Sequence, residues 1–451
     1  MKRLFIYASL LLFITNVFGQ VKSISKEEMI QDIDILFSTI KKVHPDMYAV
    51  YPKYKLHKDI ERVKGELKDE ADIFYFFEKV NPLVVKLGDG HTGGFFPRAH
   101  LGLDPDIRLF PFTVKVTYPE KAIVVQNDFT QSQTAISRGG QITKINNRPA
   151  KYIVQEMMNL VSGEKDFFKT ERLEVLFTPL LYALYRDSVF DIEYEFDRKM
   201  QSVQVKGIPH EERYKRRSAE KEESPELYSL SILQDENIGI LDIKLFVSDL
   251  DDFKLFLDSA FQVLQDKNIG NLIIDIRENG GGNSRLGDEV FQYISPVPFA
   301  QFGKTIMKYS DIQKEYYRTN YNREVTNPNG IEILNENPEL TKLRENDLRY
   351  NGDVYLLISH YTFSSAASFS WAFQYLNMGT VIGQESGGIA VCFGDNITQD
   401  LPNTGLSYSI SHKKFYQYGA TDENNHGTLP DYEVPKEKAL DFAIDLITKP
   451  Q

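Results

Sequence analysis

The stretch LIIDIRENGGG, residues 272–282, determines the fold class of this chain. It begins within an almost unbroken apolar run, Asn271 to Ile276, and ends in a polar turn that is closed by glycines. An apolar run of this length indicates a β-strand buried on both faces, as in the parallel sheet of an α/β domain. Glycines directly after such a strand let the backbone approach a ligand and present N–H groups to it.

Strands and helices alternate on both sides of this stretch. Ile238–Ile243 and Val354–Ile358 are predicted strands, and each is followed by a segment with apolar residues at helical spacing. A further strand is expected to begin at Val381. This order predicts an α/β domain over residues 227–451, with a mostly parallel sheet covered by helices. In such sheets the chemistry gathers at the carboxyl ends of the strands.

The segments before this domain differ from it, and from one another, in their residue patterns. Residues 20–103 are predicted to form a helical module, in which Ser25 and Glu28 have the spacing of a capping box. Residues 104–207 change to short segments rich in β-branched and aromatic residues, which predicts a β-rich domain. Residues 208–226 carry a dense mixture of charges and are interpreted as a solvated linker or long hairpin loop.

Composition excludes some classes of function. The chain has 451 residues, which predicts two or three domains, and its net charge of −12 argues against nucleic acid as a partner. Residues 1–19 combine a basic start, an apolar run and a small residue, so we expect a signal peptide and a periplasmic or secreted protein. A membrane anchor is disfavoured because the run is shorter than the ~20 residues of a spanning helix.

Neither the cysteine content nor the known cofactor motifs indicate a disulfide or a bound group. Cys392 is the single cysteine, so it cannot form an internal disulfide, and its apolar neighbours predict a buried, inert thiol. The sequence has no HExxH motif, no P-loop and no dinucleotide fingerprint, and therefore no metal or cofactor is predicted.

Ser364 and Ser365 stand between a predicted strand and a predicted helix. A hydroxyl at such a turn is exposed, and the first N–H groups of the helix can bind a developing oxyanion. Serine is also among the best helix N-caps, so this local context alone leaves both roles open.

His91 is the first candidate for a general base. It lies in LGDGHTGG, residues 87–94, among glycines that follow a predicted helix, and histidine is the usual base for a serine nucleophile. Of the eight histidines, His426 near the C-terminus is the one serious rival.

Together these segments resemble the C-terminal processing peptidases, a family of serine peptidases that includes the tail-specific proteases and the tricorn core. Residues 272–282 resemble its D-L-R-x-N-x-G-G motif, and residues 362–366, TFSSA, its nucleophile motif. Residues 381–388 and 427–434 resemble the next strand and the closing G-x-x-P-D-x-x-V. The resemblance implies a catalytic domain of crotonase-like ββα units, preceded by a helical module and a PDZ-like domain.

The resemblance also implies roles. Ser364 would be the nucleophile, and the N–H groups of Gly281 and Ser365 would form the oxyanion hole. One branch of the family uses a lysine base, but Ile389 stands at that position. His91, in L-x-D-x-H-T, matches the histidine of the tricorn-like branch.

Two positions depart from that branch. Gly90 replaces the serine that precedes the histidine, and Asn424 stands where a supporting glutamate is expected. Glu423, one residue away, is the candidate for the third catalytic residue.

The resulting hypothesis is an exported serine peptidase that hydrolyses polypeptides through a Ser364 acyl-enzyme, with His91 as general base. Capture of the substrate by its C-terminus stays open, since residues 104–112 contain no clear carboxylate-binding loop. The alternative is a catalytically inactive family member that binds peptides or hydrophobic ligands, because the family resemblance includes a retinoid-binding protein.

Overall fold

The computed structural model of the chain describes residues 23–130, 136–219 and 226–449. The predicted signal peptide, residues 1–19, lies outside these described residues. Among the helices of the described part, none is both long enough and apolar enough to cross a membrane.

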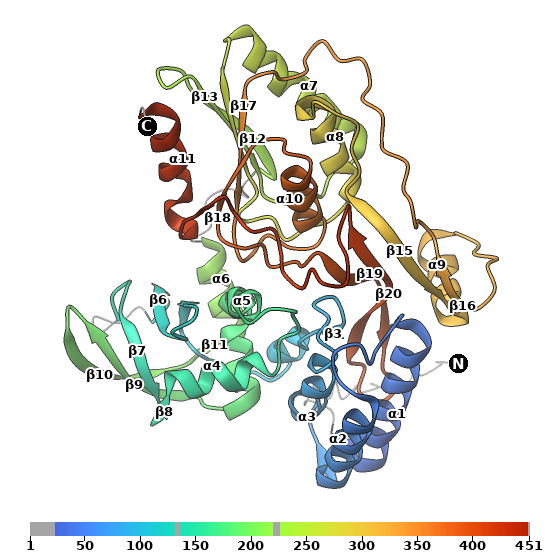
Figure 1. Cartoon of the computed structure of the whole chain (residues 1–451). Helices are drawn as coiled ribbons and strands as arrows, with labels where there is room; N and C mark the ends of the chain where they lie inside the picture. Colours follow the sequence, from blue (N-terminus) through green and yellow to red (C-terminus); the bar gives the residue numbers. More distant parts are fainter. Residues whose placement is uncertain (1–22, 131–135, 220–225, 450–451) are drawn as a thin grey trace, which may run out of the picture.

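A six-stranded sheet forms the centre of the upper part of the molecule in Figure 1. Its strands lie in the order β12 (Tyr228–Leu233), β13 (Ile238–Ile243), β14 (Asn271–Asp275), β17 (Asp353–Ile358), β18 (Thr380–Gly383) and β21 (Tyr432–Glu433). β12 pairs antiparallel with β13, and every other neighbouring pair is parallel. The predicted mixed α/β fold with a mostly parallel sheet is confirmed.

The strand β14 is apolar throughout because both of its faces are covered. Leu272 and Ile274 belong to a core with α7 (Leu250–Asp266), α8 (Ser284–Ile294) and α10 (Ser365–Tyr375). Ile273, between them, belongs to a second core with α11 (Ala439–Thr448). Burying each such side chain contributes about 1.5–3 kcal/mol, so the strand fixes both layers.

The N-terminal part consists of α1 (Lys26–Val43), α2 (Lys53–Glu66) and α3 (Ile73–Val85). The expected capping box starts α1, where Ser25 Oγ accepts the Glu28 N–H and the Glu28 carboxylate accepts the Ser25 N–H. Short segments also pair here and beyond: β1 (Ile24–Ser25) with β2 (Glu70–Ala71), and β4 (Arg108–Leu109) with β11 (Ile208–Pro209). Two 3₁₀-helices cover Arg98–Gly102 and Lys436–Lys438.

A second sheet follows, at the lower left of Figure 1. Its order is β10 (Lys199–Lys206), β9 (Val189–Phe196), β7 (Gln141–Ile145), β6 (Ile123–Asp128) and β5 (Phe112–Val116), with β8 (Arg148–Pro149) paired to β7. Two helices accompany it, α4 (Ala150–Met158) and α5 (Asp166–Tyr185).

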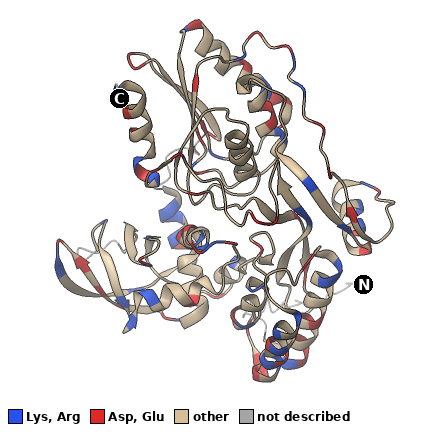
Figure 2. Ribbon diagram, viewed as in Figure 1, with Lys and Arg blue, Asp and Glu red and all other residues tan. Residues whose placement is uncertain are grey.

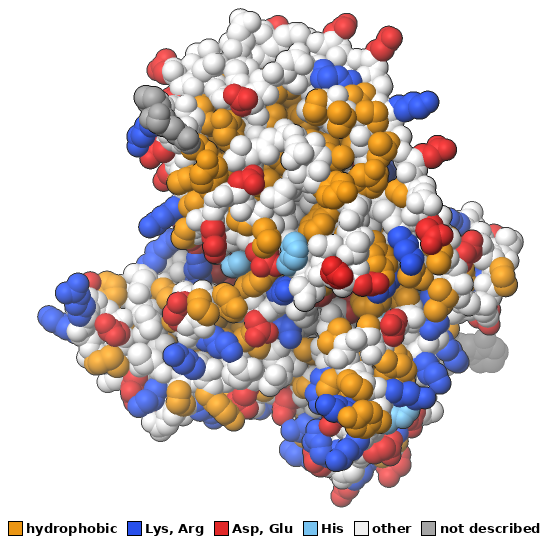
Figure 3. Space-filling model, in the orientation of Figure 1, with side chains coloured by type: hydrophobic (Ala, Val, Ile, Leu, Met, Phe, Trp, Pro, Cys, Tyr) orange, Lys and Arg blue, Asp and Glu red, His pale blue; other side chains and the backbone are white. Residues whose placement is uncertain are grey.

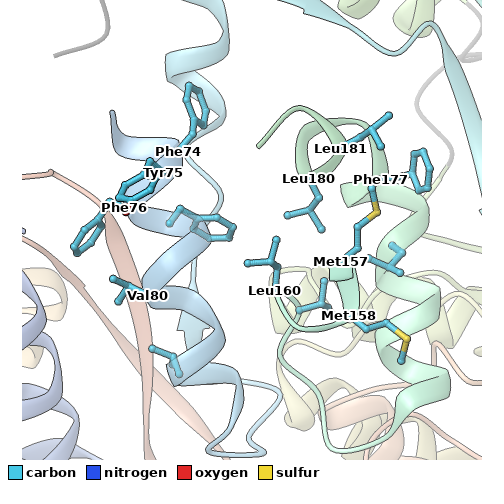
Figure 4. Packing of buried hydrophobic residues seen from close by; sticks show 14 of the residues in the cluster. Phe74, Tyr75, Phe76, Val80, Met157, Met158, Leu160, Phe177, Leu180 and Leu181 are labelled. Carbon is cyan, nitrogen blue, oxygen red and sulfur yellow. The ribbon is translucent and has the colours of Figure 1, made fainter. Parts of the chain in front are cut away.

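One hydrophobic core runs through both N-terminal segments. Figure 4 shows Phe74 and Val80 of α3 on one side and Met157, Leu160 and Leu180 of the α4–α5 segment on the other. All of them belong to the same cluster of buried side chains. The boundary expected between residues 103 and 104 therefore does not separate two cores.

A long hairpin joins the two halves of the molecule. It consists of β19 (Val391–Asp400) and β20 (Ser407–Gln417), and it reaches from the upper part down to α1 (Figure 1). Its tip is bound by buried Asp32, whose carboxylate accepts the N–H groups of Asn403 and Thr404 at 3.2 and 2.8 Å. β15 (Phe302–Tyr309) extends this sheet, followed by α9 (Asp311–Tyr321) and β16 (Gly330–Ile333).

Residues 208–219, the described first part of the charged segment, form regular structure where a linker or loop was expected. Residues His210–Ala219 form α6, part of which is coloured blue for Lys and Arg in the ribbon of Figure 2. Arg213 explains this order, because its guanidinium donates to the carbonyl groups of Phe110 and Phe112 and to Thr178 Oγ1. Elsewhere on the visible face, side chains of both charges are interspersed (Figure 3).

Candidate active site

Ser364 occupies the turn between β17 and α10. Its φ is +54° and its ψ −128°, a backbone conformation that is strained for a residue with a side chain. The hydroxyl caps no helix amide, and Ser364 Oγ instead lies 3.0 Å from His91 Nε2. Ser364 is the N-cap residue of α10 by position, but its side chain does not cap the helix.

His91 is held in a loop that is fastened to the hairpin. The strand β3 (Gly93–Gly94), directly after it, pairs antiparallel with β20, and Ser409 Oγ donates to the His91 carbonyl. The imidazole stacks on Phe363, with ring centroids 4.6 Å apart, and Phe363 stacks in turn on Phe168 at 4.1 Å. These ring contacts fix the orientation of the imidazole, with its Nε2 facing Ser364.

The charge state of His91 suits a base. Burial lowers the pKa of its imidazole below the ordinary value of 6.5, and the nearby carboxylate of Asp89 opposes this shift only in part. His91 is therefore neutral at pH 7, and its Nε2 is able to accept the Ser364 proton.

Two carboxylates lie on the other side of His91, the buried one of Asp89 and the half-buried one of Glu164. Asp89 Oδ1 accepts the His91 N–H at 2.8 Å and lies 3.9 Å from His91 Nδ1, and Asp89 Oδ2 lies 3.3 Å from His44 Nε2. Burial alone would raise the Asp89 pKa, but the hydrogen bond and charge of His44 hold that pKa below its usual range. Glu164, just before α5, accepts the Gly90 N–H through Oε1 at 3.0 Å.

The same three side chains have a spacing that a metal ion could use. One ligand atom from each of Asp89, His91 and Glu164 lies within 4.8 Å of the other two. Both carboxylates already accept backbone N–H groups, from His91 and Gly90. We therefore interpret the group as an electrostatic cluster around the histidine.

Glu423 is not brought to His91. Its side chain is exposed in the turn after β20, and its backbone N–H donates to Thr421 Oγ1. The carboxylates beside the His91 ring come instead from Asp89 and Glu164. The rival base, His426, lies against Trp371, and its Nδ1 is 2.7 Å from the Gly427 carbonyl.

The two expected oxyanion donors differ in their surroundings. Ser365 is the first residue of α10 and lines the cleft beside Ser364. Gly281 lies against Ser364, since a Cβ on it would be 2.6 Å from Ser364 Cβ. Its N–H, however, donates to Asn279 Oδ1 at 2.9 Å. The next residue, Gly282, lines the cleft.

The cleft in front of Ser364 and His91 has a volume of about 500 Å³. Its wall includes the aromatic rings of Phe302, Phe393 and Phe415, and an ion pair between Lys413 and Asp395. Cys392 also lines the cleft, so the expected burial of this residue is incomplete, but burial of its thiol raises the pKa and keeps it protonated.

Several residues of the site were not found from the sequence. Asp89 stands in the same motif as His91, and this short spacing was the available signal. Glu164 and Phe168 are more than 70 residues away in the chain, and nothing in their local sequence indicates a contact with the histidine loop.

A strained serine between a strand and a helix, within hydrogen-bonding distance of a half-buried neutral histidine, is the arrangement of a serine hydrolase. Residues 237–434 match the model of peptidase family S41. This segment of the chain is similar to the S41 peptidases, and the match supports a peptidase of the serine type.

Solved structures support the fold. The crystal structure of mature CPAF superimposes with a TM-score of 0.65 at 13% identity, covering 94% of this chain and 97% of that one. Mature CPAF complexed with lactacystin gives 0.65 at 14% identity, with 94% and 98% covered. The crystal structure of a CPAF s499a mutant gives 0.66 at 14% identity, with 94% and 97% covered. No curated protein matches the sequence.

Proposed function

We propose that the chain is an exported serine peptidase, in the periplasm or secreted, that hydrolyses polypeptides through an acyl-enzyme on Ser364. The observation that carries this proposal is the 3.0 Å separation of Ser364 Oγ and His91 Nε2, which come from segments 273 residues apart. Residues 104–207 are proposed as a PDZ-like domain that precedes the catalytic domain.

The reaction begins when His91 Nε2 accepts the Ser364 proton while Oγ attacks the carbonyl carbon of the scissile bond. The carbonyl electron pair moves to the oxygen, and collapse of the tetrahedral intermediate expels the amine, which takes the proton from His91. Water then enters and attacks the acyl carbon while His91 takes its proton. Collapse of this second intermediate releases the acyl group as an acid, and Ser364 Oγ takes the proton back from His91.

The oxyanion is stabilised by the Ser365 N–H at the N-terminus of α10 and by the glycine turn after β14. For the Gly281 N–H to serve, it has to share or leave its hydrogen bond to Asn279 Oδ1. The substrate side chain is received by the aromatic wall of the cleft, which favours an apolar residue at the cleavage site.

A fluorophosphonate probe tests the proposal, because it reacts covalently with an activated serine hydroxyl. We expect labelling of the wild-type chain and none of Ser364→Ala. Ser365→Ala is the matched control, since it keeps the backbone N–H and removes a buried hydroxyl with no hydrogen-bond partner among the described residues. Loss of labelling in Ser365→Ala alone would move the nucleophile by one residue.

A second candidate function is supported by a further cavity. It has a volume of about 480 Å³ and lies beside the His91 loop. Its lining combines apolar residues such as Phe77, Phe96 and Leu176 with polar ones such as Arg98 and Arg172. An inactive family member could bind a hydrophobic ligand there. Absence of fluorophosphonate labelling, together with binding of a fluorescent fatty acid at this cavity, would favour this alternative.

A further inference from the structure

Gly90 has no room for a side chain. A Cβ at this position would lie 2.6 Å from Glu164 Oε2 and 2.8 Å from Phe363 Cζ, both far inside contact distance. The carboxylate of Glu164 therefore occupies the space that a side chain before His91 would take. This position is also one of the two at which the sequence departs from the tricorn-like pattern.

Two polar atoms beside this space are buried without partners. Among the described residues, neither His91 Nδ1 nor Glu164 Oε2 has a hydrogen-bond partner. Such atoms are rare, because an unsatisfied buried polar group costs about 1–3 kcal/mol. Both belong to the group of Asp89, His91 and Glu164, whose ligand atoms lie within 4.8 Å of one another.

We propose that Glu164, together with Asp89, is the positioning carboxylate of His91 and stabilises the imidazolium that forms during acylation. This inference rests on the proposed function. Glu164 takes the role expected of Glu423, which is exposed. It reaches His91 from the entry to α5 in place of the C-terminal segment, and Gly90 is the residue that makes room for it.

The charges around Glu164 are consistent with this role. Burial, and then the charge of Asp89, raise the pKa of Glu164 to about 7, while the guanidinium of Arg172 opposes that rise. Lys169 and Cys392 are the other titratable groups that interact with it. Around His91 itself, Asp89 and Asp395 favour the charged ring, as does the Phe393 carbonyl, and Arg172 disfavours it.

The proposed step moves a single proton. The Ser364 proton moves to His91 Nε2, and the ring becomes a cation that keeps its proton on Nδ1. An ionised Glu164 near this cation lowers its energy, and no proton has to leave the ring toward Glu164. Above about pH 7 the carboxylate is ionised before the step begins, so the base becomes more effective as the pH rises through that value.

The experiment compares the rate of fluorophosphonate labelling of wild-type and Glu164→Gln from about pH 5 to about pH 9. Glutamine keeps the oxygen that accepts the Gly90 N–H but cannot ionise, so a purely structural role would survive the change. We expect about a 10²-fold slower rate at pH 8 and loss of the rise near pH 7. Glu164→Asp, which keeps the charge, should stay within about tenfold of wild-type.

Glu174→Gln is the matched control. Glu174 lies on α5, and burial raises its pKa to about 7 as well, but the charged groups around it are Glu171, Lys436, Lys115 and Glu278. Its substitution should leave the labelling profile unchanged. Wild-type rates in Glu164→Gln, or equal losses in Glu164→Gln and Glu164→Asp, would overturn the inference while leaving the proposed function standing.

A second measurement does not depend on activity. In a Ser364→Ala background, the His91 pKa followed by NMR should be lower with Glu164→Gln than without it, because the variant removes a charge that favours the imidazolium. An unchanged His91 pKa would contradict the inference even if the wild-type chain is not labelled. A loss of wild-type labelling on adding EDTA, equal to that caused by Glu164→Gln, would assign the cluster to a bound cation and also overturn it.

Discussion

The imidazole of His91 stacks on the ring of Phe363, with centroids 4.6 Å apart and planes inclined by 25°. Phe363 is the residue directly before Ser364, so one ring contact ties His91 to the turn that carries this serine. The position of the proton acceptor is therefore linked to the strained turn by packing as well as by the hydrogen bond between their side chains.

Removing this contact should loosen the base. We expect Phe363→Ala to slow fluorophosphonate labelling by about 10–10²-fold, because misplacement of a catalytic group by about 1 Å has costs of this size. Phe363→Leu keeps an apolar side chain and should lose less. A labelling rate for Phe363→Ala equal to wild-type would show that the hydrogen bond alone positions His91.

The pH profile of labelling should rise in two steps. The first step lies below pH 6.5, because burial lowers the His91 pKa and the base works only when neutral. Activity is therefore kept at neutral pH and lost as the pH falls through that lowered pKa. The second step lies near pH 7 and belongs to Glu164. A single step above pH 7 in wild-type would contradict both assignments.

Glu164 should lower the stability of the chain at alkaline pH. Its pKa is raised from 4.5 to about 7, so the folded chain binds this proton more tightly than the unfolded chain. The stability from this proton is present at low pH and is lost as the pH rises through about 7. The melting temperature of Glu164→Gln minus that of wild-type should therefore be larger at pH 8 than at pH 5. A smaller difference at pH 8 would contradict a Glu164 carboxylate that is charged in the folded chain at that pH.

Asp32 should be needed to hold the β19–β20 hairpin on α1. Its carboxylate is buried and accepts backbone N–H groups of Asn403 and Thr404, so Asp32→Ala leaves these donors without an acceptor. We expect a loss of about 2–4 kcal/mol in the free energy of unfolding, measured with urea. Asp34→Ala, which removes an exposed partner of Lys64, should cost less than about 1 kcal/mol.

The central sheet could be predicted from the sequence because its strands are apolar on both faces. The run Asn271–Ile276 becomes β14 within one residue of its predicted end, and Ile238–Ile243 is β13. Here the pattern follows directly from burial against two layers of helices.

The helix α5 was not predicted, and with it the entry segment that carries Glu164 was missed. Its buried residues include Phe168, Thr178, Leu180 and Leu181, which lie around the helix in place of a single stripe, and Pro179 stands inside it. Without a periodic pattern, a helix of this kind gives little signal.

The sequence predicts Glu423 as the third catalytic residue, one position from the place that the C-terminal motif gives it. Sequence distance could not show that Glu423 faces solvent, or that a carboxylate far away in the chain fills the space beside Gly90. The pairing of β3 with β20 was equally hidden, since a strand pattern defines which face is buried but not which strand lies alongside.

That pairing also sets the order in which the peptidase is completed. The strand β3 brings His91 to a hairpin that follows Ser364 in the chain, so the two side chains meet only after residues on both sides of Ser364 have folded. The histidine is synthesised first, and the pair that would carry catalysis is complete only when the last third of the chain has joined it.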